Sequence, residues 1–473
     1  MLPFPSLSIH PDKLIARGSF AEAQATFLSP DPAVVTELNA RLHAQRVGLV
    51  AHFYMDPELQ GVLAACDPKH AHISDSLVMA DAAVAMADAG MKAIVVLGVD
   101  FMSENVRAML DVAGHPDVPV YRVTAEPIGC SLAEAARSEA YGAYLAKAAG
   151  TPRSVHVIYI NTSLDVKARA HNVVPTITCT SSNVVQTVLQ IFAQIPDVHV
   201  WFGPDTYMGQ NIVELLRGVV GLDDALAQTL HPMHTAQTIR SALERFHHFE
   251  QGACVVHHMF GSEVVNRVER DYADSFVTAH FEVPGEMFRL ALAAQREGRG
   301  VVGSTSNILE FINRRVRERA ASDSREKLRF ILGTEAGMIT AIVRGVQRTL
   351  AETGAHDLEA EIVFPVASSA IARTDDRELA IVPGVAGGEG CTTAGGCATC
   401  PFMKMNSLDA LCDLLAELGR GGAELARHHP KLYSEQLGSR RIAELGSEPI
   451  LHMRELGRTG ALSDALVAQV LVR

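Results

Sequence analysis

Short, almost continuous apolar runs rich in β-branched residues recur along this chain and leave few folds open to it. The runs VGLVAHFY (47–54) and AIVVLGVDFM (93–102) do not alternate apolar with polar residues. This pattern is typical of strands that are buried on both faces of a parallel sheet. Ala- and Leu-rich stretches with helical spacing separate the runs, so we expect an α/β fold of repeated β-α-β segments. Further runs lie at 118–123, 154–161, 176–181, 198–204, 253–260, 275–283, 299–304, 328–335 and 361–367.

Serine, threonine and asparagine gather where the expected strands pass into helices. The joints Thr180-Ser-Ser-Asn183 and Ser304-Thr-Ser-Asn307 are near copies, and Ser74-Asp-Ser76, Ser103-Glu-Asn105 and Thr334-Glu335 resemble them. Such residues are preferred N-caps, and helix N-termini at the carboxyl ends of parallel strands also bind anions. Both interpretations stay open for these joints.

The recurrence of these joints predicts three related α/β units. We expect the units at 45–149, 150–252 and 253–390, the last with an insertion around 345–395. An N-terminal extension (1–44) precedes them, and a cysteine loop with C-terminal helices (391–473) follows them.

Charge and hydropathy exclude several classes of function. The 473 residues carry a formal net charge of −13 without a basic face, which argues against binding of nucleic acid. No apolar run approaches the length of a membrane span, and the prolines in MLPFPSLSIHPDK do not suit a signal peptide. We therefore expect a cytoplasmic protein whose thiols stay reduced, so that clustered cysteines favour metal or redox chemistry over disulfides.

The stretch GCTTAGGCATCPFMKMN concentrates three of the eight cysteines, Cys391, Cys397 and Cys400. No second CxxC accompanies it, as a zinc site with four thiolates requires, and a Cys-Pro commonly ends a run of iron–sulfur ligands. Cys130 and Cys254 stand at turns or strand starts and are either small buried side chains or further ligands. Three ligands from separate units would leave one iron of a 4Fe–4S cluster without a thiolate, as a Lewis acid. Cys66 and Cys412 lie in helical patterns and suit plain packing, and Cys179 is ambiguous.

A series of short motifs runs from about His52 to Asn406: AHFYMDPELQ, ISDSLVMA, GVDFMSEN, YINTS, CTSSNVV, CVVH, GSTS, GTEAGM and CPFMKMN. Taken together and in order, they resemble motifs of the quinolinate synthase family, iron–sulfur enzymes of NAD biosynthesis. The resemblance implies a 4Fe–4S cluster held by Cys130, Cys254 and Cys400. Cys391 and Cys397 match cysteines that only some members carry, for which a redox role can be imagined.

The resemblance also implies the residues of the active site. The catalytic residues would be His52, Tyr54, His280 and Glu282, with Tyr54 and Glu282 providing an acid and a base. Family members carry His-Pro-Glu where this chain has Phe281 between the His and the Glu. The substrate-binding residues would be His52, Ser76, Tyr159, Asn161, Ser181, His280, Glu282, Ser304 and Thr305.

The implied activity is that of a condensing and dehydrating transferase. Iminoaspartate and dihydroxyacetone phosphate would form quinolinate with loss of phosphate and water, and the enzyme would be coupled to one that produces iminoaspartate. The implied fold places three α/β units around a pseudo-threefold axis, with the cluster and active site at the centre. Two alternatives stay open, which are an iron–sulfur hydro-lyase of the aconitase type and a non-enzymatic redox sensor that holds a cluster or zinc.

Overall fold

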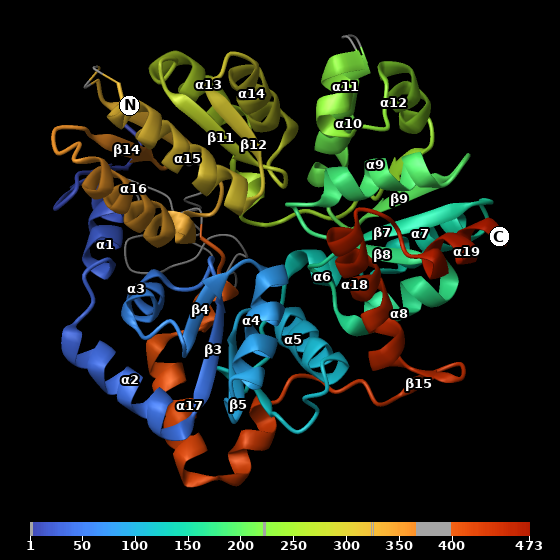
Figure 1. The fold of residues 1–473 in the computed structure, drawn as a ribbon, viewed down its shortest axis with the longest axis horizontal. Coiled ribbons are helices and arrows are strands. Elements are labelled where there is room, and N and C mark those ends of the chain that lie inside the picture. The colour runs from blue at the N-terminus through green and yellow to red at the C-terminus, as the bar shows by residue number, and fades with distance from the viewer. Residues whose placement is uncertain (1–2, 221–223, 323, 325, 366–398) are drawn as a thin grey trace, which may run out of the picture. The chain divides into compact units, whose positions relative to one another are not determined.

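The computed structural model describes residues 3–220, 224–322, 324, 326–365 and 399–473, and it contains three sheets of parallel strands (Figure 1). In each sheet four parallel strands follow one another along the chain, with helices between them. This confirms the α/β fold with parallel sheets that the apolar runs predict. The first sheet contains β3 (Val47–His52), β4 (Ala71–Ser74), β5 (Ala93–Leu97) and β6 (Val120–Arg122). The second contains β7 (Ser154–Tyr159), β8 (Thr176–Cys179), β9 (His199–Gly203) and β10 (Phe246–His248). The third contains β11 (Phe276–His280), β12 (Gly300–Gly303), β13 (Leu328–Gly333) and β14 (Ala360–Val363).

The three sets of four strands share one topology. Their orders are β4-β3-β5-β6, β8-β7-β9-β10 and β12-β11-β13-β14, so the second strand always flanks the first on the side away from the third. All pairs within these sets are parallel. The chain therefore repeats one α/β pattern three times. The arrangement of the repeats around a threefold axis stays a prediction.

Two strands near the N-terminus extend the third sheet. β1 (Ser6–Ile9) pairs antiparallel with β14, and β2 (Leu14–Arg17) pairs antiparallel with β1. Leu7 and Ile9 are fully buried in the same core cluster as Ile342 and Leu350. The sequence pattern did not indicate these strands, because each is only four residues long and neither is a continuous apolar run like those of the central strands.

The chain divides into two compact units. The first comprises residues 1–99, 115–128 and 255–429, and the second comprises 100–114, 129–254 and 430–473. The first contains the first and third sheets, and the second contains the second sheet. This division follows compactness rather than the repeat of strands, so the borders expected for the three α/β units stay a prediction.

The helices of the first unit cover its two sheets. α4 packs on β3 and β4, α14 packs on β11 and β12, and α15 packs beside α16 (Figure 1). The α-helices are α1 (Ser19–Phe27), α2 (Pro32–Gln45), α3 (Pro57–Ala65), α4 (Ser76–Asp88), α13 (Ser262–Asp271), α14 (Gly285–Arg296), α15 (Thr305–Ala320), α16 (Ile339–Thr353) and α17 (Leu408–Arg420). The 3-10 helices are η1 (His257–Met259), η2 (Ala336–Met338), η4 (Met403–Met405) and η5 (Ala423–His428).

In the second unit a helix from the C-terminal region completes the cover of the sheet. α18 packs on α8 and β8 (Figure 1), although more than 260 residues separate it from them in sequence. The helices are α5 (Asp100–Val112), α6 (Ser131–Ala135), α7 (Glu139–Ala149), α8 (Leu164–Val173), α9 (Val184–Gln194), α10 (Thr206–Val220), α11 (Asp224–Leu230), α12 (Ala236–Leu243), α18 (Ile442–Thr459) and α19 (Asp464–Leu471). A short hairpin of β15 (Gln436–Leu437) and β16 (Arg440–Arg441) precedes α18.

One expectation about local structure needs correction. The apolar run at 253–260 is a loop with the 3-10 helix η1, and the fourth strand of the second sheet is the earlier β10. Val256 and Phe260 are buried there as loop residues, which explains why the run resembles a strand. The insertion expected around 345–395 stays a prediction; of its first residues, 345–353 belong to α16 and 360–363 to β14. Residues 366–395 lie outside the described part of the chain.

None of the helices in the described ranges combines the length and the apolar character that crossing a bilayer requires.

Candidate active site

The end of β3 presents His52 and Tyr54. His52 is the last residue of the strand, and its Nδ1 accepts a hydrogen bond of 3.2 Å from the backbone N–H of Tyr54. The two rings meet edge to face with centroids 4.7 Å apart. The side-chain amide of Gln60 on α3 donates to the carbonyl of Phe53 between them. The turn after β3 is thus fixed from both sides, and it holds the phenol of Tyr54 in one orientation.

The Tyr54 hydroxyl lies between two threonine hydroxyls. Its oxygen is 2.8 Å from Oγ1 of Thr305, the first residue of α15, and 3.3 Å from Oγ1 of Thr334, which follows β13. Burial of the phenol and the nearby carboxylate of Glu282 raise the pKa of Tyr54 above its usual value. Tyr54 is therefore a protonated phenol near neutral pH and is suited to donate a hydrogen bond or a proton.

Thr334 connects Tyr54 to a buried histidine and a carboxylate. Its Oγ1 is 3.2 Å from Nε2 of His257, and Nδ1 of His257 is 3.0 Å from Oε2 of Glu282. His257 is fully buried and Glu282 is 3% exposed. A continuous chain of hydrogen-bonding groups therefore leads from the phenol through a hydroxyl and an imidazole to a carboxylate.

The end of β11 repeats the turn at the end of β3. His280 is the last strand residue, and its Nδ1 accepts a hydrogen bond of 3.3 Å from the N–H of Glu282. The His280 ring stacks on that of His257 with centroids 4.7 Å apart. Burial lowers the pKa of His280 to about 3 and that of His52 to about 4, so both rings are neutral at physiological pH. Each neutral ring accepts at Nδ1 and carries its proton on Nε2.

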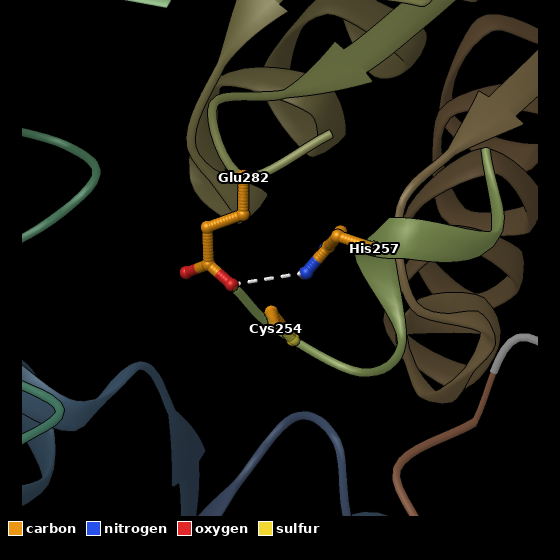
Figure 2. A group of neighbouring side chains, drawn as sticks. All are labelled: Cys254, His257 and Glu282. Carbon is orange, nitrogen blue, oxygen red and sulfur yellow. Dashed lines mark ion pairs between the residues drawn. The ribbon is translucent and has the colours of Figure 1, made fainter. Parts of the chain in front are cut away.

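Cys254, His257 and Glu282 form a group that could hold a metal ion. The Cys254 sulfur, a His257 nitrogen and a Glu282 oxygen all lie within 4.8 Å of one another. Figure 2 shows the Glu282 carboxylate facing the His257 ring, with the Cys254 side chain beside them. Thiolate, imidazole and carboxylate are ligands of zinc and related ions.

The two copied joints share one hydrogen bond. In one, the N–H of Ser304 donates to Oδ1 of Asn307 at 2.9 Å, and in the other the N–H of Thr180 donates to Oδ1 of Asn183 at 2.8 Å. The Ser304 hydroxyl also donates to Asn307 and accepts from its N–H, so it caps α15. Helix capping therefore accounts for Ser304, whereas the neighbouring hydroxyl of Thr305 faces Tyr54.

The other expected substrate-binding residues lie at strand ends in both units. Ser76 begins α4 in the first unit, directly after the N-cap Asp75, whose carboxylate accepts from the N–H groups of Leu77 and Val78. In the second unit, Tyr159 ends β7, Asn161 follows it, and Ser181 follows β8. The structure thus brings Tyr54, Thr305, His280 and Glu282 together in the first unit, and it describes Tyr159, Asn161 and Ser181 within the second.

The expected cluster ligands stand on loops and are partly exposed. Cys130 and Cys254 lie on segments joined by a hydrogen bond of 3.0 Å from the Ser131 hydroxyl to the Ala253 carbonyl. The N–H of Cys400 donates to Oε1 of Glu335 at 3.1 Å. By contrast, Cys66 and Cys179 are buried, and burial raises the pKa of both thiols. Partly exposed thiols on loops can lose their protons and bind iron more readily than buried thiols, so Cys130, Cys254 and Cys400 suit an iron–sulfur group better than Cys66 and Cys179 do. Cys391 and Cys397 lie outside the described residues.

Glu335 supports the loop of Cys400. It is 1% exposed, and its second oxygen accepts a hydrogen bond of 2.6 Å from the N–H of Gly337. Burial raises the pKa of Glu335 to about 8 against the effect of these two N–H groups. A Cβ on Gly337 would come within 2.8 Å of the Phe53 carbonyl, so only glycine lets this loop approach the turn of Tyr54 so closely.

Sequence reasoning missed His257, Thr334 and Glu335 as site residues. The first was hidden by the strand expected at 253–260, although it belongs to the motif CVVH. The joint Thr334-Glu335 stood among the strand-to-helix joints, for which capping and anion binding both stayed open, but neither residue was named as a site residue. In the structure Glu335 indeed accepts from the first turn of η2, while Thr334 turns its hydroxyl toward Tyr54.

Comparisons with known proteins agree with this arrangement. The model of the family described as "Quinolinate synthetase A protein" matches residues 36–427. A chloroplastic quinolinate synthase of Nicotiana tabacum is 54% identical over 99% of this chain and 67% of its own length. The chloroplastic quinolinate synthase of Arabidopsis thaliana is 51% identical over 99% of this chain and 67% of its own length. A quinolinate synthase of Prochlorococcus marinus (strain MIT 9303) is 25% identical over 89% of this chain and 90% of its own length. The chain thus spans about two thirds of the length of the two plant relatives.

The cytoplasmic location expected from the sequence is wrong on this comparison. Relatives that are 50% to 54% identical over 99% of the chain are named as chloroplastic proteins. The expectation rested on the lack of a long apolar run and of a secretory pattern. Neither observation distinguishes the cytoplasm from another compartment in which thiols stay reduced.

Proposed function

Because the chain belongs to the quinolinate synthase family, enzymes of NAD biosynthesis that act on small molecules, we propose that it condenses iminoaspartate with dihydroxyacetone phosphate. The product is quinolinate, and phosphate and two waters leave. Since imines hydrolyse in water, we also propose functional coupling to an enzyme that produces iminoaspartate.

The observation that carries the proposal is the chain of groups from Tyr54 to Glu282. Condensation and dehydration need a base that takes a proton and an acid that returns one to a departing hydroxyl. Glu282 is the base, and Tyr54, whose raised pKa keeps it protonated, is the acid. His257 and Thr334 lie between them and pass a proton from one to the other, which resets both groups for the next step.

The neutral histidines and the helix starts bind and orient the substrates. Nε2–H groups of His52 and His280 donate hydrogen bonds to substrate oxygens, because both Nδ1 atoms already accept from the backbone. Helix N-termini favour phosphate and carboxylate groups through their N–H groups and dipoles. The substrate-binding residues of the proposal are His52, Ser76, Tyr159, Asn161, Ser181, His280, Glu282 and Thr305, while Ser304 caps the helix that presents Thr305.

Cys130, Cys254 and Cys400 would hold a 4Fe–4S cluster, and their placement on partly exposed loops supports this. When bound by three thiolates, such a cluster supplies one iron that acts as a Lewis acid toward hydroxyl or carboxylate oxygens. Glu335 holds the backbone at Cys400 through its N–H, and so fixes where that thiol stands.

Iron counting tests the ligands. We expect serine in place of Cys130, Cys254 or Cys400 to lower iron and sulfide per chain after anaerobic reconstitution, because serine is a poor ligand of iron–sulfur clusters. The matched controls are Cys66→Ser and Cys412→Ser, which should leave the iron content unchanged. A variant at any of the three positions that kept the full cluster would remove that residue from the ligand set. Zinc bound in place of iron and sulfide would favour the group of Cys254, His257 and Glu282 as a site for a single ion.

Removal of a single hydroxyl tests the acid. Tyr54→Phe keeps the ring against His52 and should keep the cluster, but lower the rate of quinolinate formation by about 10²–10⁴, as loss of acid–base catalysis does. The control is Tyr121→Phe, a buried tyrosine of the same unit that stacks on His429. Wild-type turnover by Tyr54→Phe with the cluster intact would leave Tyr54 a packing residue.

A further inference from the structure

A buried lysine in the second unit fastens the turn that carries Tyr159 and Asn161. Lys167 lies on the first turn of α8 and is fully buried. Its Nζ donates to the carbonyl of Ile160 at 3.1 Å and to the carbonyl of Thr162. These carbonyls stand on either side of Asn161, so one ammonium group holds both ends of the turn.

The turn itself is tight. The N–H of Thr162 donates to the Ile160 carbonyl at 2.7 Å, which closes a three-residue turn with Asn161 at its centre. The Thr162 hydroxyl donates to the Tyr159 carbonyl at 3.0 Å, and the N–H of Ile160 donates to the backbone carbonyl of Cys179 in β8 at 2.9 Å. The carbonyl of Ile160 therefore accepts two hydrogen bonds. The carbonyls before and after Asn161, those of Ile160 and Thr162, both accept from Lys167. Lys167 therefore helps to fix the backbone from which the Asn161 side chain extends.

A buried glutamate, Glu104, holds the start of the helix that carries Lys167. Glu104 on α5 is 3% exposed, and its Oε2 accepts a hydrogen bond of 2.9 Å from the N–H of Leu164, which begins α8. Its Oε1 accepts one of 2.9 Å from the hydroxyl of Tyr433. Burial lowers the pKa of Lys167 to about 7, while the charge of Glu104 counteracts this. α5, α8 and the segment before α18 thus all contribute to holding one turn.

A buried lysine needs a reason, because apolar residues of similar volume often stabilise a fold as well as buried charged residues do, or better. α8 could cover β7 with a methionine at this position. A lysine there gives the Ile160 carbonyl a second donor beside the N–H of Thr162, and it also donates to the carbonyl of Thr162.

We propose that Lys167 is a positioning residue, which holds the turn 159–163 so that Asn161 and Tyr159 present their side chains to a substrate. The proposal rests on the role of Asn161 in the proposed function. Lys167 acts through the turn and does not touch the substrate, so its effect appears in substrate binding before it appears in the chemical step.

The first test replaces the ammonium group by an apolar one of similar length. In Lys167→Met, we expect amide hydrogen exchange to become faster in peptides that contain 159–163, and KM for one substrate to rise by roughly tenfold, as loss of a buried charged hydrogen bond would give. The fall in kcat should be smaller, and the iron content should not change. The control is Lys147→Met, an exposed lysine on α7 of the same unit. Unchanged exchange in the turn, or unchanged KM, would overturn the proposal.

A double substitution distinguishes the positioning role of Lys167 from the proposed role of Asn161 in substrate binding. Asn161→Ala alone reports whether Asn161 binds a substrate, and we expect its KM to rise. If Lys167 acts through Asn161, Lys167→Met should raise KM far less in the Asn161→Ala variant than it does in the wild type, because the two effects are not additive. Additive effects would show that Lys167 acts elsewhere and would overturn the proposal. An unchanged KM in Asn161→Ala would instead contradict the role of Asn161, and the positioning role of Lys167 would fall with it.

A milder variant covers the case in which Lys167→Met does not fold. Tyr433→Phe keeps the ring and removes only the hydroxyl that holds Glu104. We expect the same changes in exchange and KM, in the same direction and smaller. If amide hydrogen exchange and KM in this variant matched the wild type, the hydrogen bond between Tyr433 and Glu104 would not help to hold the turn 159–163.

Discussion

At the scale of single residues, the sequence indicates the two ends of the chain of hydrogen-bonding groups from Tyr54 to Glu282 but not its middle. His52, Tyr54, His280, Glu282 and Thr305 are expected from motifs, and the structure places Tyr54 against Thr305 and His280 beside Glu282. The residues between Tyr54 and Glu282 are His257 and Thr334. The hydroxyl of Thr334 contacts Tyr54, 280 residues away in sequence, and His257, 77 residues away. No local sequence pattern encodes such contacts.

Thr334→Val tests the middle of the path. Valine has nearly the shape of threonine and removes the hydroxyl that lies 3.3 Å from Tyr54 and 3.2 Å from His257. We expect kcat to fall by about 10²-fold, with little change in KM and a normal iron content, because the proton no longer passes between acid and base. The control is Thr278→Val, since Thr278 is buried in the same unit and donates to the backbone of Ile331 instead. If Thr334→Val turned over substrate like the wild type, the proton would not travel through Thr334.

At the scale of secondary structure, the copied joints show both what a pattern predicts and where it stops. Ser304-Thr-Ser-Asn307 begins α15 as its residue types predict, and the same hydrogen bond from the first N–H to the asparagine side chain recurs at Thr180-Ser-Ser-Asn183, where α9 begins only at Val184. The choice between capping and ligand binding depends on the direction of each hydroxyl. In α15 the first hydroxyl is turned to Asn307 and the second to Tyr54. That difference comes from helix geometry and packing and is absent from the composition of the joint.

Neighbouring substitutions at this joint should therefore have different effects. Ser304→Ala removes the N-cap and should lower the free energy of unfolding by about 1 kcal/mol, with KM less affected. Thr305→Ala leaves the cap in place and should raise KM for a substrate and lower kcat, because Tyr54 loses its partner at 2.8 Å. Thermal unfolding and steady-state kinetics of both variants measure the contrast. The same change in both measurements for both variants would mean that the joint acts only as a cap.

At the scale of the whole molecule, buried parallel strands are the part of the fold that the sequence predicts well. Short, almost continuous apolar runs suit few other settings, and the three sets of strands share one order. The N-terminal strands β1 and β2 were not expected, because what holds them to β14 is distant in sequence. Ser6 on β1 donates to Glu361 on β14 at 2.7 Å, and Arg329 on β13 donates to the same carboxylate at 2.8 Å. Such a network depends on partners more than 300 residues apart, which a local pattern does not reveal.

Glu361 should make the stability of the first unit depend on acid. Burial alone would raise its pKa, but hydrogen bonds from Arg329, Ser6 and Lys327 hold the pKa at about 2, below the ordinary value of 4.5. A carboxyl whose pKa is lowered by folding stabilises the folded state fully above its unfolded pKa, and this contribution is lost as pH falls through the folded pKa. Glu361→Gln should therefore lower the free energy of unfolding by about 1–3 kcal/mol near neutral pH.

The difference between Glu361→Gln and the wild type should shrink between about pH 5 and about pH 2, because the wild-type carboxyl becomes neutral as well. Thermal midpoints measured across this range follow the change. Glu352→Gln, at an exposed position of α16, is the control and should match the wild type at every pH. A constant difference between Glu361→Gln and the wild type from neutral to acid pH would mean that shape, and not the charge of Glu361, holds β1 and β13 to β14.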